Sequence, residues 1–397
     1  MRDTILHLAD LHLDASPEAR LDDAVRAWLL GARRRILNAL ASWIARDESR
    51  IGLVLIAGDL FDRHDPPQEV VSEARTALAE IARLVPVVTV PGNHDEYSYA
   101  QCVYRRGDWP GVLVTSPEPQ LVWKGQLGDS VCAVVSAAYQ AGKVSPGQRL
   151  RFPSRSQVMG GDDSNGVLIG LFHSTLADHF PDEFVRNERC FVLSHQEAAN
   201  AGYDYLALGH FHTRREWRIG ACLAHYPGPP LGARIADPGS GQLSLVRIRN
   251  GTVTLEGLSA GPMVGCQWMF LDVELQPEEK PREVVERIAE RCRNVEASSG
   301  IAPIHVARLK GNTIHGDLAE QIQNELRAKG VSCTVVAHEL EEILSPDIEA
   351  MAAEESLVGY FVRSWQEWQS RQEVSRAEAM AVLYEGLLAL GWHRANN

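Results

Sequence analysis

Short hydrophobic runs alternate with longer amphipathic stretches over the first 95 residues. Runs of five or six mostly apolar residues begin at Ile5, Leu53 and Val85, and stretches with helical spacing at 24–45 and 67–84 separate them. A strand that reads as continuously hydrophobic is covered on both faces. The pattern therefore predicts a β-α-β-α-β order, in which helices sandwich a sheet.

A second series of apolar runs follows. Further strands are predicted at 131–135, 166–171 and 205–208, and a hairpin with an Asn-Gly turn is predicted at 243–255. After Gly261-Pro262 strand-like and helix-like stretches alternate in a small α+β unit, and from residue 340 the pattern is helical. We therefore expect three domains, at 1–262, 263–339 and 340–397.

Composition is that of an ordinary folded protein, with 45% hydrophobic and 23% charged residues. No apolar run approaches the roughly 20 residues that a membrane-spanning helix needs, which predicts no membrane partner. The N-terminal segment is too short and too polar for a signal peptide. The seven cysteines are scattered and form no Cys-x-x-Cys pair. This pattern predicts a cytoplasmic protein with reduced thiols, without a zinc knuckle or a disulfide framework.

The net charge of −13 is unevenly distributed along the chain. Residues 339–397 carry 11 acidic and 4 basic side chains, so more than half of the excess lies in this C-terminal segment. The acidity argues against a protein that coats nucleic acid. It does not exclude an enzyme that holds phosphate through metal ions and a few arginines.

Five short motifs each follow or end one of the predicted strands. They are Asp10-Leu11-His12, Gly58-Asp59-Leu60-Phe61-Asp62, Gly92-Asn93-His94-Asp95, Phe172-His173-Ser174 and Gly209-His210-Phe211-His212. Ligands of open α/β sheets bind beyond the carboxyl ends of the strands, so all five motifs can converge on one crevice. The glycines before Asp59, Asn93 and His210 allow tight turns that bring these side chains inward.

The residue types in these motifs indicate a metal site. Carboxylate, amide oxygen and imidazole without thiolate suit Mn, Fe or Zn in an open catalytic site. Asp-x-His and His-x-His place alternate side chains on one side of an extended backbone. Each motif alone is weak, and a buried histidine that bonds a backbone carbonyl is the alternative interpretation of His173. Five motifs in this order favour a shared site.

These motifs, in this order, resemble those of the calcineurin-like metallophosphoesterase superfamily. The resemblance implies a two-sheet β-sandwich flanked by helices, with a small α+β capping domain and a C-terminal helical tail. It also implies two divalent metal ions, Mn first and Fe or Zn as options, bridged by Asp59. Asp10, His12 and His212 would complete one site, and Asn93, His173 and His210 the other. His94 would act as general acid or stabilise the transition state, and Asp62 would orient it.

The segments His7–Asp14, Gly58–Asp62 and Gly202–His210, with Tyr226-Pro227-Gly228, resemble the SbcD-like DNA repair exonucleases, especially their YhaO-type branch. That resemblance implies a DNA substrate. It also implies that residues 263–339 cap the site and that residues 340–397 dock on an SMC-like ATPase of the SbcC type. Asp14 stands where many SbcD-type chains have glycine.

We therefore interpret the chain as a metal-dependent DNA exo/endonuclease subunit that uses two metals in DNA repair. One alternative is a phosphodiesterase or phosphatase for nucleotides or other small phosphoesters. Another is a scaffold that tethers an ATPase and retains only residual catalysis. The sequence leaves a homodimer open.

Two further interpretations concern single features. Arg33-Arg34-Arg35 is predicted to be a solvated helix face, and the stripe with Phe361 and Trp365 is either core or a partner surface.

Overall fold

The computed structural model describes residues 2–160, 166–181, 185, 189–277, 279–294, 301–313, 317–342, 347–371 and 376–391. The chain forms two compact units, Met1–Gln267 and Trp268–Asn397. The finer division into three domains remains a prediction. None of the described helices combines the length and the hydropathy that a membrane span requires.

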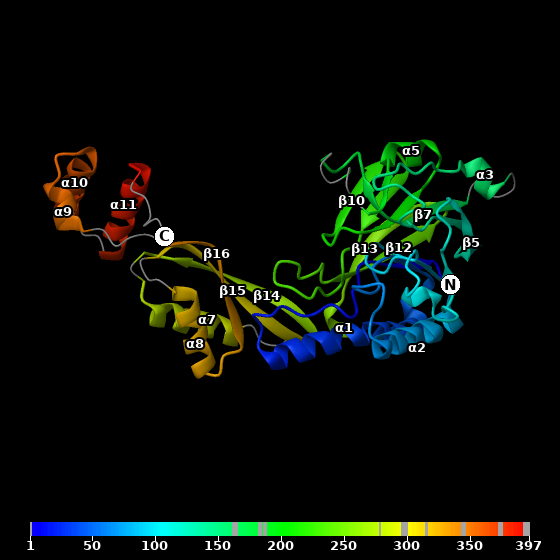
Figure 1. Ribbon diagram of the computed structural model, residues 1–397, viewed down its shortest axis with the longest axis horizontal. Helices are drawn as coiled ribbons and strands as arrows, with labels where there is room; N and C mark the ends of the chain where they lie inside the picture. The colour runs from blue at the N-terminus through cyan, green and yellow to red at the C-terminus, as the bar shows by residue number, and fades with distance from the viewer. Residues whose placement is uncertain are drawn as a thin grey trace. The chain divides into compact units, whose positions relative to one another are not determined.

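Two β-sheets build the first unit (Figure 1). The first sheet has the order β13-β12-β1-β2-β3-β4, with β1 Thr4–Leu8, β2 Ile51–Ala57, β3 Val87–Val90, β4 Val112–Leu113, β12 Gln242–Arg249 and β13 Thr252–Ser259. The second has the order β10-β11-β9-β7-β6-β5, with β5 Gln120–Leu127, β6 Ser130–Ser136, β7 Val167–Leu176, β9 Tyr205–Gly209, β10 Arg215–Ile219 and β11 Cys222–Tyr226, and with β8 Phe191–Leu193 beside β7. Strands β1 to β4 are parallel, as are β6, β7, β9 and β11. Their carboxyl ends therefore share one edge of each sheet.

The hydrophobic core lies between the two sheets. Ile5, Leu53 and Leu55 of the first sheet and Val134 and Ile169 of the second belong to one buried cluster. Since side chains alternate along a strand, their neighbours point to the outer face of each sheet. The flanking helices are α1 Asp23–Ile44, α2 Gln68–Leu84, α3 Arg155–Met159, α5 His195–Asn200 and α6 Gly261–Val264, and short 3-10 turns lie at Asp47–Ser49 and Val103–Arg105. Figure 1 shows α1 and α2 along the outer side of the first sheet. The predicted two-sheet sandwich flanked by helices is confirmed.

The hairpin predicted from the Asn-Gly pair is also present. Strands β12 and β13 pair antiparallel from Gln242↔Ser259 to Arg249↔Thr252. The turn between them places Asn250 at φ +49° and Gly251 at φ +71°. Two successive residues with positive φ are typical of the tight turn that Asn-Gly favours, so the local sequence determines this pairing.

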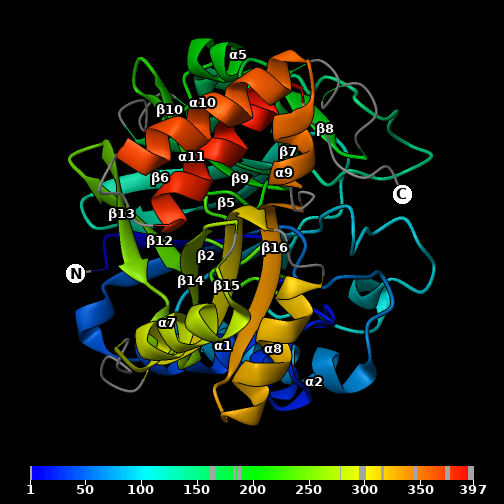
Figure 2. The ribbon, with the colours of Figure 1, turned by 90° about the vertical axis from the view of Figure 1, so that its left-hand side faces the viewer.

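The second unit begins with a three-stranded sheet and two helices. The sheet order is β14-β15-β16, with β14 Cys266–Leu275, β15 Ala302–Thr313 and β16 Cys333–Glu342. Helices α7 Pro281–Asn294 and α8 Leu318–Ala328 lie side by side on one face of it (Figure 2). Val284, Ile288 and Ile322 from these helices pack with Leu309 of β15 in one buried cluster.

Three helices form the C-terminal segment, at α9 Ile348–Ala353, α10 Leu357–Arg371 and α11 Arg376–Ala389. Trp365 of α10 is 6% exposed and its Nε1 donates to the carbonyl of Ala379 at 2.7 Å. It packs with Val362, Leu383 and other residues of α10 and α11. Of the two interpretations of the aromatic stripe, the structure therefore favours core for Trp365, while Leu357 and Tyr360 on the same helix are 68% and 66% exposed.

Candidate metal centre

The five predicted motifs converge at the carboxyl ends of parallel strands. Asp10 and His12 follow β1, Asp59 follows β2, and Asn93 follows β3, which are neighbours in the first sheet. His173 and His210 come from β7 and the end of β9, which are neighbours in the second. His173 lies inside β7, because this strand continues to Leu176 and not to residue 171 as predicted. The crevice therefore lies where the two sheets end together.

The carboxylate of Asp59 lies at the middle of this arrangement. Its Oδ2 is 3.7 Å from Nε2 of His12 and 3.5 Å from Nε2 of His173. Its Oδ1 accepts from the backbone N–H of His94 at 2.9 Å. One carboxylate oxygen thus faces a histidine from each of the two ligand sets, which is the position of a bridging ligand.

The first ligand set is Asp10, His12 and His212, whose ligand atoms all lie within 4.8 Å of one another. Nε2 of His12 and Nε2 of His212 face each other at 3.2 Å. Nδ1 of His212 bonds the carboxylate of Asp237, and Nδ1 of His12 lies 3.2 Å from Oδ1 of Asp62. The His212 ring bonds Asp237 through Nδ1, and the Nε2 atoms of the two rings point at each other. Two imidazole nitrogens this close need a proton or a cation between them, so these residues fit a metal ion.

The second ligand set surrounds the side-chain oxygen of Asn93. Nε2 of His173 lies 2.8 Å from this oxygen, and Nδ1 of His210 lies 3.1 Å from it. His173 directs its other nitrogen, Nδ1, to the backbone carbonyl of Ala57 at 2.9 Å. Metal-binding histidines almost always donate their second ring N–H in this way, which fixes the ring and leaves Nε2 free. Asp10, Asp59 and His173 also form a compact set of three ligand atoms.

The titration behaviour of these groups matches a site built for cations. Burial lowers the pKa of His212, but its hydrogen bond to Asp237 and the charge of Asp10 raise that pKa to about 9 overall. Burial likewise lowers the pKa of His12, but the interaction with Asp62 and the charges of Asp59 and Asp10 together outweigh burial and raise that pKa. In the metal-free protein protons therefore take the place of cations, and metal binding must displace them. Acid is expected to weaken metal binding for this reason.

Two buried carboxylates experience opposite influences. Burial raises the pKa of Asp10 overall, although His173 and His212 lower it. Burial also raises the pKa of Asp59, but the imidazoles of His173, His12 and His94, with the backbone N–H of His94, together outweigh burial and lower that pKa overall. Anions in this position need positive charge nearby, since an uncompensated buried ion costs several kcal/mol. The chain supplies imidazoles, and no lysine or arginine belongs to either set.

The backbone is constrained at the same residues. Seven described non-glycine residues have positive φ, and four of them are Asp10, His12, Asp59 and His210. Such conformations cost about 1–3 kcal/mol each and gather at functional sites, where the surroundings over-determine them. Gly58 has φ +87°, as a tight turn requires, whereas Gly92 is needed for space, because a Cβ there would lie 2.0 Å from Oδ1 of Asp59. The strain and the close packing both hold ligands inward.

His94 lies at the rim of the site. Its side chain is 44% exposed, and its Nδ1 donates to the backbone carbonyl of Asp62 at 3.0 Å. The Asp62 carboxylate is closer to His12, at 3.2 Å, than to His94, at 3.7 Å. The contact that holds the His94 ring is therefore the main chain of Asp62, and the second ring nitrogen, Nε2, takes no part in that contact.

Two residues at the site were missed by sequence reasoning. Asp237, in the loop before β12, bonds His212. Arg33 was predicted to be solvated, which is wrong: it is buried, and its guanidinium donates to the carbonyls of Leu11, Ala15 and Leu231. Arg33 therefore ties the loop that carries Asp10 and His12 to the loop that leads to Asp237.

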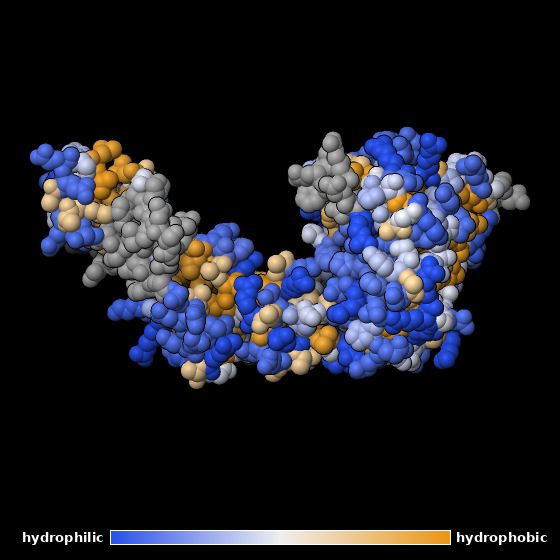
Figure 3. Space-filling view, in the orientation of Figure 1, coloured by the Kyte–Doolittle hydropathy of each residue, from blue (hydrophilic) through white to orange (hydrophobic). Residues whose placement is uncertain are grey.

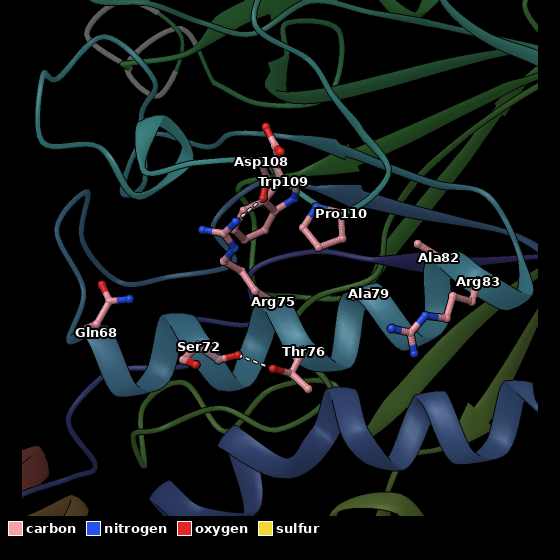
Figure 4. Close-up of a pocket in the computed structure, with 10 residues that line it drawn as sticks. All are labelled: Gln68, Ser72, Arg75, Thr76, Ala79, Ala82, Arg83, Asp108, Trp109 and Pro110. Carbon is pink, nitrogen blue, oxygen red and sulfur yellow. Dashed lines mark hydrogen bonds between the residues drawn. The ribbon is translucent and has the colours of Figure 1, made fainter.

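A cavity of about 330 Å³ opens beside the metal centre. Asp10, His12, His94, His212 and Asp237 line it together with Arg234. A larger groove of about 620 Å³ runs along α2 past Trp109 (Figure 4). There Arg75 already donates to the carbonyl of Arg106 at 2.6 Å. Each cluster of described residues that could hold a metal includes at least one residue that lines the smaller cavity, which is therefore the catalytic candidate.

Comparison with known proteins agrees with this geometry. The family of calcineurin-like phosphoesterases matches residues 3–214, more than half of the chain. The metallophosphoesterase YhaO of Bacillus subtilis is 24% identical over 273 residues, covering 64% of this chain and 59% of YhaO. The DNA double-strand break repair protein Mre11 of Aeropyrum pernix is 28% identical over 265 residues, covering 59% of this chain and 56% of that protein. Mre11 of Methanopyrus kandleri is 27% identical over 195 residues, covering 46% of this chain and 40% of that protein. The matches thus span less than two thirds of each relative.

Replacing Asp237 with alanine should weaken metal binding while the fold persists. The His212 ring would lose the acceptor that fixes its orientation, and such losses typically reduce metal affinity about 10- to 100-fold. Calorimetric titration with Mn²⁺ measures the effect. The control is Glu256→Ala on β13, which removes a half-exposed carboxylate that pairs with Arg247 of β12. An unchanged Mn²⁺ affinity in Asp237→Ala would show that Asp237 does not support the site.

Proposed function

The chain belongs to the calcineurin-like phosphoesterase family, and from this premise we propose that it is a two-metal DNA exo/endonuclease subunit. The main observation in favour of two metal ions is the position of Asp59 Oδ2. This oxygen lies 3.7 Å from Nε2 of His12 and 3.5 Å from Nε2 of His173. The similarity to two Mre11 repair proteins supports DNA as the substrate. We expect Mn²⁺ first and Fe²⁺ or Zn²⁺ as alternatives, because the ligands are oxygen and imidazole nitrogen.

When bound, two divalent cations supply charge neutralisation for a phosphodiester and activate a water as the nucleophile. The residues of the chain would do the rest. Asp59 would help to hold both cations, and the backbone carbonyl of Asp62 holds Nδ1 of His94. Nε2 of His94 would donate a proton to the leaving oxygen or stabilise its developing charge. Arg234, exposed at the cavity, would contact a flanking phosphate.

Exposed hydrophobic side chains on the C-terminal helices favour binding of a protein partner. Of the five large hydrophobic residues that are well exposed in the described chain, three lie there: Leu357, Tyr360 and Val382. Hydrophobic colour appears on the surface of these helices in Figure 3. Because the segment is strongly acidic, the partner surface should be basic. We propose an SMC-like ATPase as that partner, with α10 as the main contact.

The proposal predicts Mn²⁺-dependent cleavage of duplex DNA with free ends. Cleavage should exceed that of a small diester such as bis(4-nitrophenyl) phosphate, compared as kcat/KM. His94→Gln should reduce kcat by about 10²- to 10⁴-fold and leave Mn²⁺ affinity intact, because general acids contribute on that order. Gel-based and chromogenic assays with Mn²⁺, Mg²⁺, Fe²⁺ and Zn²⁺ measure both activities.

Asp59→Asn serves as the comparison in the same assays, because it should lose metal binding along with activity. If His94→Gln loses the metals equally, His94 is a ligand and not an acid. Turnover of the small diester without any DNA cleavage would instead support the alternative of a phosphodiesterase for small substrates. Metal binding without turnover of either substrate would support the scaffold.

The double variant Leu357→Ser/Tyr360→Ser should abolish capture of the ATPase partner and retain hydrolysis of the small diester. Both side chains are exposed, so their loss should change the stability of the helices little. Co-purification of the coexpressed ATPase measures the effect, with Gln366→Ser, an exposed and uncharged position on the same helix, as the control. Trp365→Ser should instead unfold these helices, since truncation of a buried tryptophan costs about 3–5 kcal/mol. Undiminished capture by the double variant would contradict this contact.

A further inference from the structure

The loop that follows β2 carries an arginine whose side chain is held at the rim of the metal centre. Arg63 comes directly after Asp62, a residue that lines the cavity beside the proposed metal ligands. Its Nε donates to Oδ2 of Asp14 at 3.0 Å, and Asp14 lies two residues beyond the proposed ligand His12. The side chain of Asp14 is 1% exposed, whereas that of Arg63 is 52% exposed. A buried anion thus anchors a cation that faces solvent.

Asp14 divides its two carboxylate oxygens between the side chain of Arg63 and the main chain. Its Oδ1 accepts from the backbone N–H of Asp62 at 2.7 Å. Because Oδ1 is occupied in this way, Arg63 bonds only Oδ2 and does so through Nε alone. Arg34, by contrast, gives both Nε and Nη2 to the carboxylate of Glu73, at 2.9 and 2.8 Å. The guanidinium of Arg63 is therefore oriented by one N–H, and its two Nη groups are not needed for that orientation.

The Nη groups of Arg63 are available to an anion from solvent. Among the described residues, none hydrogen-bonds either Nη group. The acidic side chains nearest to Arg63 along the loop have other partners, because Asp62 faces Nδ1 of His12 at 3.2 Å and Asp65 pairs with Arg106. The planar fork of a guanidinium matches the oxygens of a phosphate, and arginine is preferred wherever phosphate is bound in this way. The chemistry of the position therefore fits a phosphate group.

We propose that Arg63 binds a DNA phosphate beside the scissile one, and that Asp14 positions Arg63 for this contact. The inference rests on the proposed nuclease function and adds a contact with the substrate that metal ions do not make. Asp62 takes part at both ends: its N–H bonds Asp14, and its carbonyl holds Nδ1 of His94 at 3.0 Å. One buried carboxylate therefore fixes the phosphate contact and the main chain that holds His94. Because Arg63 is oriented in advance, it loses little side-chain freedom when it binds.

The salt dependence of DNA binding tests the contact. The affinity of the full-length, Mn²⁺-loaded protein for a fluorescent duplex is measured by anisotropy from about 50 to 200 mM KCl. All proteins carry His94→Gln, so that the DNA stays intact. Each phosphate contact contributes about 0.9 to the slope of log K against log salt, so Arg63→Ala should reduce the slope by about 0.9. Arg249→Ala is the matched control and should keep the slope. Arg249 is 61% exposed and lies 3.6 Å from the buried carboxylate of Asp3, at the amino end of β1 and away from the site.

A double-mutant cycle tests the positioning role of Asp14. Asp14→Asn keeps an oxygen for the N–H of Asp62 but removes the ion pair, so Arg63 regains its rotamer freedom. DNA affinity should fall about two- to tenfold in the parent protein, because Arg63 must then be ordered on binding. The same substitution should change the affinity little in the Arg63→Ala background, where the positioned side chain is gone. Equal effects of Asp14→Asn in both backgrounds would show that Asp14 does not act through Arg63.

Changes in the DNA locate the phosphate that Arg63 binds. Duplexes that each carry one uncharged methylphosphonate are compared in the same binding assay. One position beside the cleaved bond should weaken binding to the parent protein and have no effect on Arg63→Ala. An unchanged salt slope in Arg63→Ala, or a methylphosphonate profile that is the same with and without Arg63, would overturn the inference and leave the nuclease function intact. A parent protein that binds no DNA at any salt concentration would instead overturn the DNA substrate, and this inference with it.

Discussion

The burial of the Asp10 and Asp59 carboxylates at one sheet edge is the constraint on which the rest of the structure depends. Both are almost fully excluded from solvent, and histidines are the cationic groups nearest to them. Anions in such a place are costly unless positive charge compensates them. Bound divalent cations would supply that compensation, and a ligand that binds only the folded state stabilises it by about 2.7 kcal/mol at a concentration of 100 Kd. Metal binding and stability should therefore be linked.

The scaffold positions these groups with main-chain contacts more than with side-chain packing. The segment after β1 continues to pair with the segment after β2, because Asp10 N–H donates to Gly58 O and His12 N–H to Asp59 O, both at 3.0 Å. The N–H of His210 from the other sheet donates to the Asp10 carboxylate at 3.0 Å. Positive φ at these residues is tolerated because each is held from several directions. Rigid placement of this kind suits a site that holds metal ions.

Much of this arrangement could be predicted from the sequence, because the strand-end motifs are local. Continuous apolar runs locate β1, β2 and β3, and the residues that follow them must meet where parallel strands end. Arg33 could have been found too. It lies four residues after Leu29 and three before Ile36, on the apolar stripe of α1, so its spacing indicated burial. The role of Asp237 could not have been predicted, because Asp237 lies in an irregular loop 25 residues beyond His212 and no periodicity points to it.

If the proposed site is right, two metal ions share the carboxylate of Asp59. A crystal structure of the protein soaked in Mn²⁺, with anomalous diffraction recorded at the manganese edge, tests this most directly. We expect two anomalous peaks about 3.5–4 Å apart, one bounded by Asp10, His12 and His212 and the other by Asn93, His173 and His210, with Asp59 between them. A single peak at full occupancy under saturating Mn²⁺, or two peaks that do not share Asp59, would contradict it.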